Sequence, residues 1–451
     1  MSKRPIRERL SRDGVRPSRK LGQNFLADEG VAAWIAEQIR PGLGDCVLEV
    51  GPGTGALTRH VAGRVRRLVL LEYDHRLAAA LRHEFGEVGG VDVVEADAAR
   101  WDFRGLFKEG PVKLLGNLPY SSGAAILRRF LARPSPVGEA VFMLQKEFVD
   151  RMVAEPRTKA YGAMSVRIQS EWEVERLRDI PPDVFVPRPA VDSSVVRLRP
   201  LAAGTYAPFD AGLFNGLVSR GFAQRRKQMH KQMPGGVDRW RDVAGALGVS
   251  WMARAEELSP GQWIELARLY DAHPLKDRPQ DAGEVLDVVN EADEVTGSGR
   301  RDEIHRDGLR HRAVHAFVFN RKGELLLQRR SAAKDNHPGL WDSSAAGHLD
   351  SGENYAGAVV RELEEELGIR EVGVVRCGVL EASELNGMEH VHLYLARWDG
   401  NPDFPCSEVD AVLWMPVEEA GAWLAARPMD FAPGFRMCWE VWRRGGGVVP
   451  E

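Results

Sequence analysis

Between about residues 30 and 200, short runs rich in valine and leucine alternate with longer segments that have the length of helices. Such alternation predicts a parallel sheet covered by helices, which is an α/β fold. The expected strands are residues 46–50, 68–72, 91–96, 112–117 and 140–145, and the clearest helices are residues 75–85 and 124–132.

The pattern changes after residue 209, where only helices are expected. The expected helices are residues 209–233, which end at Pro234-Gly235-Gly236, then residues 238–247, and a third helix capped by Ser259 with Pro260 at its first position. Residues 272–284 hold two prolines, several charges and almost no apolar periodicity, so a linker is expected there. Beyond it we expect a hairpin around residues 321–323, a helix at 354–367, and strands near 390–397 and 410–415.

The net charge of −4 hides an asymmetry between the two parts of the chain. Residues 1–272 hold 41 Lys and Arg against 33 Asp and Glu, whereas the remainder holds 20 against 32. The basic part suits a polyanionic partner. The N-terminus lacks the apolar core of a secretory signal, and no apolar run is long enough to cross a bilayer. We therefore expect a cytoplasmic protein without membrane contact, with free thiols at Cys46, Cys377, Cys406 and Cys438.

A glycine-rich turn follows the first expected strand. Gly51, Gly53 and Gly55 allow backbone to approach a ligand where a side chain would collide. Glu72, at the end of the next strand, is placed to accept hydrogen bonds from ribose hydroxyls, and Asp97 follows the third strand, where it can bind an adenine amine. Each feature alone is compatible with an ordinary tight turn or surface charge, but their order along the strands favours a ligand site.

The fourth expected strand ends in Asn117-Leu118-Pro119-Tyr120. An adenine amine is a poor nucleophile because its lone pair is delocalised into the ring. An Asn oxygen and a backbone carbonyl that accept its hydrogens would favour a more pyramidal, attacking nitrogen. Tyr120 offers a face on which an extruded base can stack. An ordinary turn with a buried tyrosine is the alternative interpretation.

The chain resembles the ribosomal RNA adenine dimethyltransferases over residues 18–272. The resemblance rests on RKLGQNFLAD (19–28), EVGPGTGALT (49–58), NLPY (117–120), FMLQKEFVDRM (142–152), TKAYGAMSV (158–166), FVPRPAVDSSVVRL (185–198) and FAQRRKQ (222–228). It implies a Rossmann-like, S-adenosylmethionine-dependent domain, a small helical domain that helps to hold RNA, and dimethylation of two adjacent adenines near the 3′ end of small-subunit rRNA. The implied partners are this rRNA and the pre-ribosomal small subunit.

The resemblance also implies roles for single residues. The implied donor-binding residues are Gln23, Asn24, Leu26, Gly51, Gly53, Gly55, Glu72, Asp97 and Asn117. The implied catalytic and target-adenine residues are Asn117, Leu118, Pro119, Tyr120 and Phe185, the last as the second side of a base sandwich.

Two related functions stay open within this resemblance. Methyltransferases that modify large-subunit rRNA share the core but look less similar at NLPY and TKAYGAMSV, and non-catalytic RNA-binding assembly factors would be expected to have a degraded donor loop. A basic patch of Arg225, Arg226, Lys227 and Lys231, expected on the first helix of the helical domain, would contact RNA phosphates. A solvated helix face is the alternative interpretation for any one of these side chains.

Residues 347–369 contain clustered glutamates. Glu362, Glu365 and Glu366 are expected on one helix face, with an apolar stripe of Ala356, Val360, Leu363 and Leu367. Such crowded carboxylates repel one another, and a hard cation such as Mg²⁺ would compensate them, bridge a diphosphate and activate water. Glu353 and Arg361 are expected to pair.

This segment fits the Nudix signature GX5EX7REUXEEXGU, in which U is a bulky aliphatic residue, at every fixed position. Residues 311–348 and 431–436 look most similar to the isopentenyl-diphosphate isomerase branch of that superfamily. That isomerase has a catalytic cysteine where this chain has Ala345, so hydrolysis of a small diphosphate-containing substrate is the favoured interpretation and isomerase-like activity the alternative.

Together these observations predict five segments. They are a basic tail (1–18), a Rossmann-like α/β methyltransferase domain (19–203), a helical RNA-binding subdomain (204–272), a linker (273–283) and an α+β Nudix domain (284–451).

Overall fold

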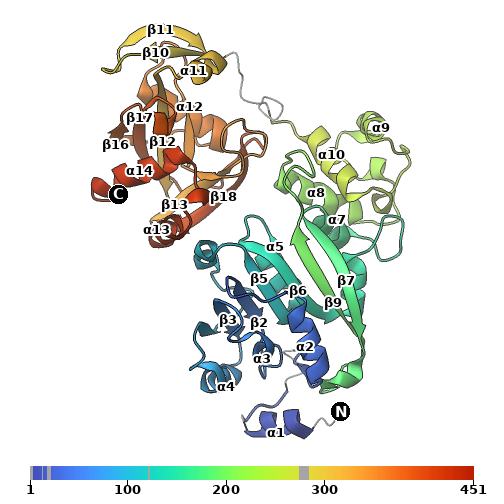
Figure 1. Cartoon of the computed structure of the whole chain (residues 1–451). Helices are drawn as coiled ribbons and strands as arrows, with labels where there is room; N and C mark the ends of the chain where they lie inside the picture. The colour runs from blue at the N-terminus through green and yellow to red at the C-terminus, as the bar shows by residue number, and fades with distance from the viewer. Residues whose placement is uncertain (1–3, 13, 18–21, 120–121, 274–283, 451) are drawn as a thin grey trace. The chain divides into compact units, whose positions relative to one another are not determined.

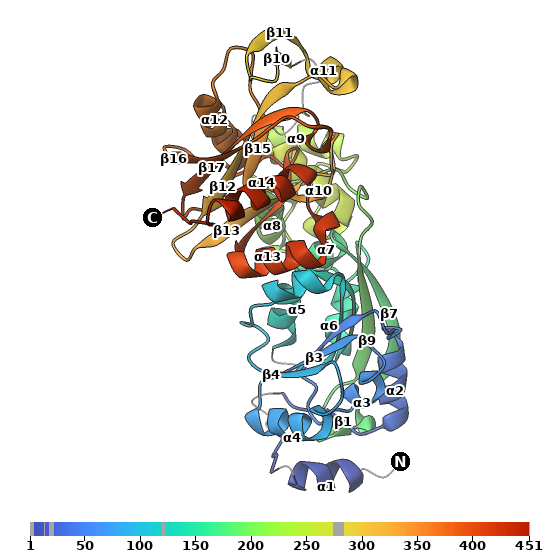
Figure 2. The same cartoon turned by 60° about the vertical axis from the view of Figure 1, so that its left-hand side comes forward.

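The computed structural model describes residues 4–12, 14–17, 22–119, 122–273 and 284–450. The chain forms two compact units (Figures 1 and 2). The first unit consists of Met1–Thr205 and Ala211–Leu269, and the second of Tyr206–Asp210 and Tyr270–Glu451.

The first unit is built on a seven-stranded sheet with the order β4-β3-β2-β5-β6-β9-β7. The strands are β2 (Cys46–Val50), β3 (Arg67–Glu72), β4 (Val91–Glu95), β5 (Val112–Asn117), β6 (Val137–Gln145), β7 (Trp172–Ile180) and β9 (Ser193–Pro200). The first five are the expected strands, and they pair in parallel. Strands β9 and β7 extend the sheet with antiparallel pairing. The carboxyl ends of β2, β3 and β5 therefore meet at one edge of the sheet.

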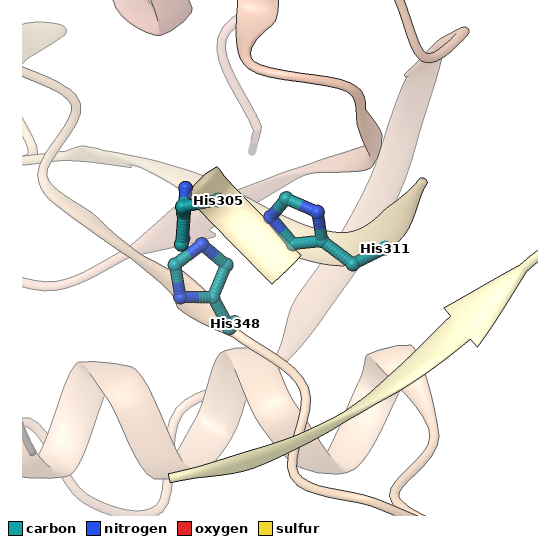
Figure 3. A group of neighbouring side chains, drawn as sticks. All are labelled: His305, His311 and His348. Atoms are coloured by element: carbon teal, nitrogen blue, oxygen red, sulfur yellow. The ribbon is translucent and has the colours of Figure 1, made fainter. Parts of the chain in front are cut away.

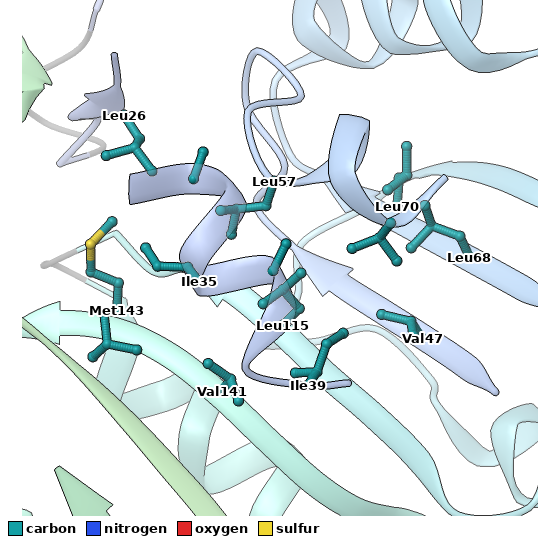
Figure 4. Packing of buried hydrophobic residues seen from close by; sticks show 14 of the residues in the cluster. Leu26, Ile35, Ile39, Val47, Leu57, Leu68, Leu70, Leu115, Val141 and Met143 are labelled. Carbon is teal, nitrogen blue, oxygen red and sulfur yellow. The ribbon is translucent and has the colours of Figure 1, made fainter. Parts of the chain in front are cut away.

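Helices pack on this sheet because apolar side chains recur along one side of each helix. The helices are α2 (Glu29–Glu37), α3 (Thr58–Val61), α4 (His75–Phe85), α5 (Gly123–Leu131), α6 (Lys146–Met152) and α7 (Ala163–Gln169). Helix α1 (Arg4–Arg12) instead belongs to a small separate cluster with Phe25 and Leu77. Figure 4 shows the core, in which Ile35 of α2 and the following Ile39 pack against Val47, Leu115 and Val141 of the sheet. Helix α2 begins after Asp28, whose carboxylate accepts a hydrogen bond from the Val31 amide (2.9 Å).

The helical part of this unit consists of α8 (Ala211–Phe222), α9 (Gly236–Ala246) and α10 (Pro260–Tyr270). The predicted helix over 209–233 is wrong, because α8 ends at Phe222. Residues 223–228 contain no large apolar side chain, so a continued helix would have no face to bury. The chain instead turns and buries Met229, whose amide donates to the carbonyl of Ala253 (2.9 Å).

The second unit contains a nine-stranded mixed sheet around β12 (His311–Phe319), which pairs in parallel with β17 (Glu389–Arg397) and antiparallel with β15 (Ala345–His348). The other strands are β10 (Val285–Val289), β11 (Val295–Arg300), β13 (Glu324–Arg330), β14 (Trp341–Asp342), β16 (Val374–Leu380) and β18 (Val409–Pro416). Strands β12 and β13 are joined by the expected turn, but they pair only at Phe319 and Leu325, and β13 pairs along its length with β18.

Helices α11 (Arg301–Asp307), α12 (Tyr355–Leu367), α13 (Val417–Ala426) and α14 (Pro433–Arg444) complete the second unit. Asn354 caps α12 by accepting from the Gly357 amide (2.9 Å). The predicted apolar stripe of α12 is partly wrong, since Ala356 and Val360 are exposed. The buried face consists of Ala358, Val359, Glu362, Leu363, Glu366 and Leu367. Two glutamates therefore share the helix face that packs on the core.

Within the described parts of the chain, no helix has the length and apolar character to cross a bilayer.

Candidate functional site

The turn after β2 has a backbone that requires glycine. Gly51, Gly53 and Gly55 have φ values of 67°, 59° and 74°, which L side chains rarely adopt. A Cβ atom on Gly53 would also lie 3.2 Å from the ring of Phe25. Gly55 lets the Phe85 ring pack closely against the turn, because a Cβ there would lie 2.9 Å from that ring. The glycines thus permit both the turn and the close approach of neighbouring rings.

Glu72 ends β3 directly beside this turn. Its Oε2 accepts a hydrogen bond from the Gly53 amide (3.0 Å), and its Oε1 accepts one from the Asp74 amide (2.9 Å). The side chain is buried, and burial raises the pKa of Glu72 while these amide hydrogen bonds oppose the rise. Because each carboxylate oxygen can accept more than one hydrogen bond, Glu72 can hold the glycine turn and still bind a diol.

A cavity of about 250 Å³ opens at this edge of the sheet and brings together most of the predicted donor and target residues. Its walls include Gln23, Asn24, Leu26, Gly51, Gly53, Glu72, Asp97, Asn117, Leu118 and Pro119. Residues from four strand ends and from the segment around β1 (Phe25–Leu26) therefore converge on one space. Asp97 is half-exposed there and accepts from the Ala99 amide (2.9 Å).

Asn117 is half-buried and is fixed in one orientation. Its Nδ2 donates to the backbone carbonyl of Asn24 (3.0 Å), so the amide oxygen Oδ1 lies on the other side of the group. The next residues are also anchored, since the Leu118 amide donates to the carbonyl of Met143 (3.1 Å) and Leu118 is buried. Oδ1 is therefore the Asn117 atom available to accept a hydrogen bond from an amine.

One predicted target residue, Phe185, is not among the residues that line this cavity. Phe185 lies in β8 (Phe185–Val186), opposite Leu26 of β1, and its ring is buried in the core. Its role as the second side of a base sandwich therefore stays a prediction. The buried position follows from the β1–β8 pairing, which turns Phe185 toward the core cluster. Tyr120 lies outside the described residues.

Glu49 is a cavity residue that sequence reasoning missed. It lies within β2 and is almost completely buried, and Oε2 accepts a hydrogen bond from Thr58 Oγ1 (2.7 Å). Burial raises the pKa of Glu49 to about 8, and the Thr58 hydrogen bond opposes this rise. An acidic residue inside an otherwise apolar buried strand was the available signal.

The predicted basic patch does not lie on the α-helix on which it was expected. Arg225, Arg226 and Lys227 are exposed in the turn after α8, and Lys231 is exposed in the short 3₁₀ segment η3 (Met229–Lys231). Arg225 pairs with Glu256 (2.6 Å) and donates to the carbonyl of Thr158 (3.1 Å). Arg225 therefore connects the helical part of the unit to the sheet-containing part, and it also contributes a positive charge to the surface.

In the second unit, Glu362 and Glu366 of α12 are buried and Glu365 is exposed. A Cβ on Gly347 would lie 2.0 Å from Glu362 Oε1, so a side chain at this position would displace the carboxylate. Burial raises the pKa of Glu362 and of Glu366, and the Glu366 charge raises that of Glu362 further. These two carboxylates thus occupy a crowded, partly desolvated place suited to a divalent cation.

Arg361 links the helix to the loop before it. Its guanidinium donates to Glu353 (2.9 Å), Glu362 (2.8 Å) and Glu365 (3.1 Å), and to the carbonyl of His348 (2.8 Å). The expected Glu353–Arg361 pair is therefore present, within a larger network. These hydrogen bonds fix the carboxylates relative to the β15 loop.

Further charged residues that sequence reasoning missed complete the surroundings of Glu366. Lys334 is buried between Glu366 (3.5 Å) and Glu408, and the Ala346 amide donates to Glu366 Oε2 (3.0 Å). Ala345, at the position where the similar isomerases have a catalytic cysteine, is buried in the apolar core cluster of this unit.

Three histidines form a second group in this unit that sequence reasoning also missed (Figure 3). His305, His311 and His348 place one ring nitrogen each within 4.8 Å of one another. Among the described residues, the buried Nε2 atoms of His305 and His311 have no hydrogen-bond partner, and Glu389 lies 3.3 Å from His348 Nε2. Burial and the neighbouring imidazoles lower the pKa of His305 to about 4, which keeps it a neutral donor of lone pairs. Such a donor set could hold a transition-metal ion.

Comparison with known proteins identifies both units. The family model for ribosomal RNA adenine dimethylase matches residues 15–272, which is more than half of the chain. The chain belongs to the ribosomal RNA adenine dimethylase family. A NUDIX domain model matches residues 309–433. This member of the dimethylase family is therefore a methyltransferase-type enzyme that also carries a Nudix hydrolase domain.

One relative of this dimethylase is the ribosomal RNA small subunit methyltransferase A of Bordetella avium, which is 40% identical over 250 residues, 55% of this chain and 93% of the relative. Among solved structures, the 23S rRNA methyltransferase ErmE is 28% identical with a TM-score of 0.44, covering 55% of this chain and 99% of ErmE. The protein DR0079 of Deinococcus radiodurans is 30% identical with a TM-score of 0.33, covering 36% of this chain and all of DR0079 (100%).

Proposed function

We propose that residues 19–272 transfer methyl groups from S-adenosylmethionine to N6 of two adjacent adenines near the 3′ end of small-subunit rRNA. The observation that carries this proposal is the convergence of the glycine turn, Glu72 and Asn117 on one cavity. Membership of the dimethylase family and 40% identity to a small-subunit methyltransferase support the choice of reaction and target. The pre-ribosomal small subunit, in the cytoplasm, is the proposed partner.

The residues present fit the methyl donor. The backbone turn at Gly51 and Gly53 leaves room for a ligand, Glu72 offers oxygens for a ribose diol, and Asp97 offers a carboxylate for an adenine amine. The bound donor would supply an electrophilic methyl group. The domain itself supplies the binding surface and shields part of the site from water, because Leu26 and Leu118 are buried beside it.

Asn117 is the residue we assign to the target amine. Its Nδ2 is held by Asn24, so Oδ1 can accept a hydrogen from the amine and favour a pyramidal nitrogen whose lone pair is free to attack. A backbone carbonyl of the Asn117-Leu118-Pro119 turn would accept the second hydrogen. Leu118 is buried and its amide is hydrogen-bonded to the Met143 carbonyl, so this turn is rigid before the base binds. This rigidity reduces the entropy that is lost when the amine is oriented.

The test uses purified protein, labelled S-adenosylmethionine and unmethylated small subunits, followed by mapping of the labelled nucleotides. Label in two adjacent adenines of small-subunit rRNA supports the proposal. Label confined to large-subunit RNA would support the alternative methyltransferase function, and RNA binding without methyl transfer would support an assembly factor.

We further propose that the Nudix domain hydrolyses a small diphosphate-containing substrate with Mg²⁺. Glu362, Glu365 and Glu366 would hold the ion, whose chemistry is to polarise the diphosphate and activate water. Arg361 fixes Glu362 and Glu365, and Lys334 offers a positive charge beside Glu366. The supporting observation is that two of the three carboxylates are buried and adjacent.

Hydrolysis is preferred to isomerisation because this chain has Ala345, a buried core residue, at the position where the similar isomerases have a catalytic cysteine. The test incubates the full-length protein and Mg²⁺ with isopentenyl diphosphate and with a panel of nucleoside diphosphate derivatives. Cleavage of the diphosphate group, seen as release of phosphate or of a monophosphate from any of these compounds, supports hydrolysis. Isomerised isopentenyl diphosphate would overturn it.

A further inference from the structure

Helix α1 precedes the residues matched by the dimethylase model, which begins at residue 15, and yet it is docked on the methyltransferase unit. Leu10 and Val15 are both buried, and they form a separate apolar cluster with Phe25 and Leu77. The Val15 amide donates to the Leu10 carbonyl (2.8 Å), so the chain turns back after the helix and both side chains reach the same patch. This packing holds α1 in place.

The patch under α1 is also a wall of the proposed donor cavity. Phe25 and Leu77 both line that cavity, and the Phe25 ring lies against Gly53, where an added Cβ would be 3.2 Å away. The same two side chains therefore contact α1 and the space assigned to the methyl donor. A change in the position of α1 would be transmitted to the glycine turn through these rings.

A polar network makes a second connection between α1 and the turn. Arg9 donates from its Nη1 to the Thr54 carbonyl (3.1 Å), between the two positive-φ residues Gly53 and Gly55. Arg59 donates to the same carbonyl and to that of Gly55 (2.8 Å), and it pairs with Glu84 (2.8 Å), which lies 4.0 Å from Arg9. Two guanidinium groups thus hold the carbonyl oxygen at the centre of the turn.

The physical consequence follows from the glycine content of the turn. Glycines make the conformation accessible, but they also allow many others, so contacts from outside the turn determine how much of the time it is formed. A hydrogen bond from a charged donor is stronger than one from a neutral group. Arg9 therefore favours the conformation in which the Gly53 amide faces Glu72 and the cavity wall is complete.

We propose that α1 holds the methyl-donor turn closed in its binding conformation, with Arg9 as the positioning residue. Arg9 contacts neither donor nor RNA in this role and acts through the Thr54 carbonyl. This inference rests on the proposed donor site, and it adds a residue outside the matched region that sets the affinity of that site.

The experiment compares full-length wild-type protein with Arg9→Gln, Arg9→Lys and the matched control Arg7→Gln, which changes an exposed arginine of the same helix. Binding of S-adenosylmethionine is measured by calorimetry, and KM for the donor and kcat are measured on unmethylated small subunits. We expect Arg9→Gln to weaken donor binding and raise KM about fivefold, as for loss of one charge-assisted hydrogen bond, while kcat stays within about twofold. Arg9→Lys should recover part of the affinity, and Arg7→Gln should match the wild type.

Hydrogen exchange of the donor-free protein separates this inference from the proposed function. We expect faster exchange at the Gly53 and Gly55 amides in Arg9→Gln than in Arg7→Gln, because these amides form the hydrogen bonds of the turn. If exchange is faster in Arg9→Gln but the wild-type protein does not bind S-adenosylmethionine, the role of α1 in holding the turn is supported and the proposed donor site is wrong. Unchanged exchange and unchanged donor affinity in Arg9→Gln would overturn the role of α1.

Discussion

Replacement of Asn117 by alanine tests the assignment of the target-amine site. The change removes the hydrogen bond from Nδ2 to the Asn24 carbonyl and the oxygen proposed to accept from the amine. The first loss affects folding, and one partly buried hydrogen bond of this kind contributes about 1 kcal/mol. For a domain of this size, about 1 kcal/mol lowers Tm by roughly 2–4 °C.

The second loss affects only the reaction. Removing one preorganised polar group that acts on the reacting atoms typically reduces the rate by about 100-fold or more. We therefore expect Asn117→Ala to remain folded at 25 °C, to bind S-adenosylmethionine within about threefold of the wild type, since one weak contact at most is lost, and to lose most methyl transfer. The assay is single-turnover transfer of labelled methyl groups to unmethylated small subunits, with Tm from calorimetry.

A matched control separates stability from catalysis. Asn354→Ala removes the N-cap of α12 and costs about 1 kcal/mol in the Nudix domain, without touching the donor cavity. It should methylate at the wild-type rate. A rate for Asn117→Ala within about threefold of the wild type, or a loss no larger than its loss of donor affinity, would refute the assigned role.

Four further outcomes are expected. Glu366→Gln should weaken Mg²⁺ binding in titration calorimetry and reduce diphosphate hydrolysis, because a buried anionic oxygen becomes neutral; unchanged affinity would remove Glu366 from the metal site. Burial raises the pKa of Glu49 in the folded state to about 8, so between about pH 4.5 and 8 the folded protein keeps a proton that the unfolded chain has lost, and stability should fall as pH rises through this range. Glu49→Gln should reduce this fall of Tm with pH, and an unchanged dependence of Tm on pH would contradict the prediction. Wild-type protein dialysed against Zn²⁺ should retain one equivalent of the ion at His305, His311 and His348 in metal analysis, and His311→Gln should not. Wild-type protein that retains no such equivalent would show that these histidines hold no ion. Arg226→Gln and Lys227→Gln should each reduce the slope of log Kd for rRNA against log salt by about one, and equal slopes would place these side chains away from phosphate.

The five parallel strands could be predicted because each contains a short run rich in valine and leucine, a pattern that is local in the sequence. Strand β7 could not, because Trp172–Ile180 carries charged side chains at the sheet edge and its partner β9 follows a proline-rich segment. The end of α8 was predicted too late in the sequence, because the burial of Met229 and its hydrogen bond to Ala253 are tertiary contacts that the local pattern does not show.

The convergence of the proposed donor residues on one cavity could be predicted because they follow consecutive strand ends, and parallel topology brings such ends to one edge. The orientation of single side chains could not, as Phe185 shows, because the β1–β8 pairing determines its burial. The grouping of His305, His311 and His348 could not be predicted from the sequence either. His311 and His348 are distant in sequence and become neighbours through the antiparallel β12–β15 register, in which Ala313 faces His348.

The central claim is methyl transfer to adenine in small-subunit rRNA, and nucleotide mapping after reaction with labelled S-adenosylmethionine tests it most directly. Purified protein is incubated with unmethylated small subunits and, separately, with unmethylated large subunits, and each RNA is digested and analysed for N6-methylated adenosine. The proposed function predicts dimethyladenosine at two adjacent positions near the 3′ end of the small-subunit RNA and none in the large subunit. Absence of methylated adenosine in the small-subunit RNA, or its appearance only in the large-subunit RNA, would contradict the proposal.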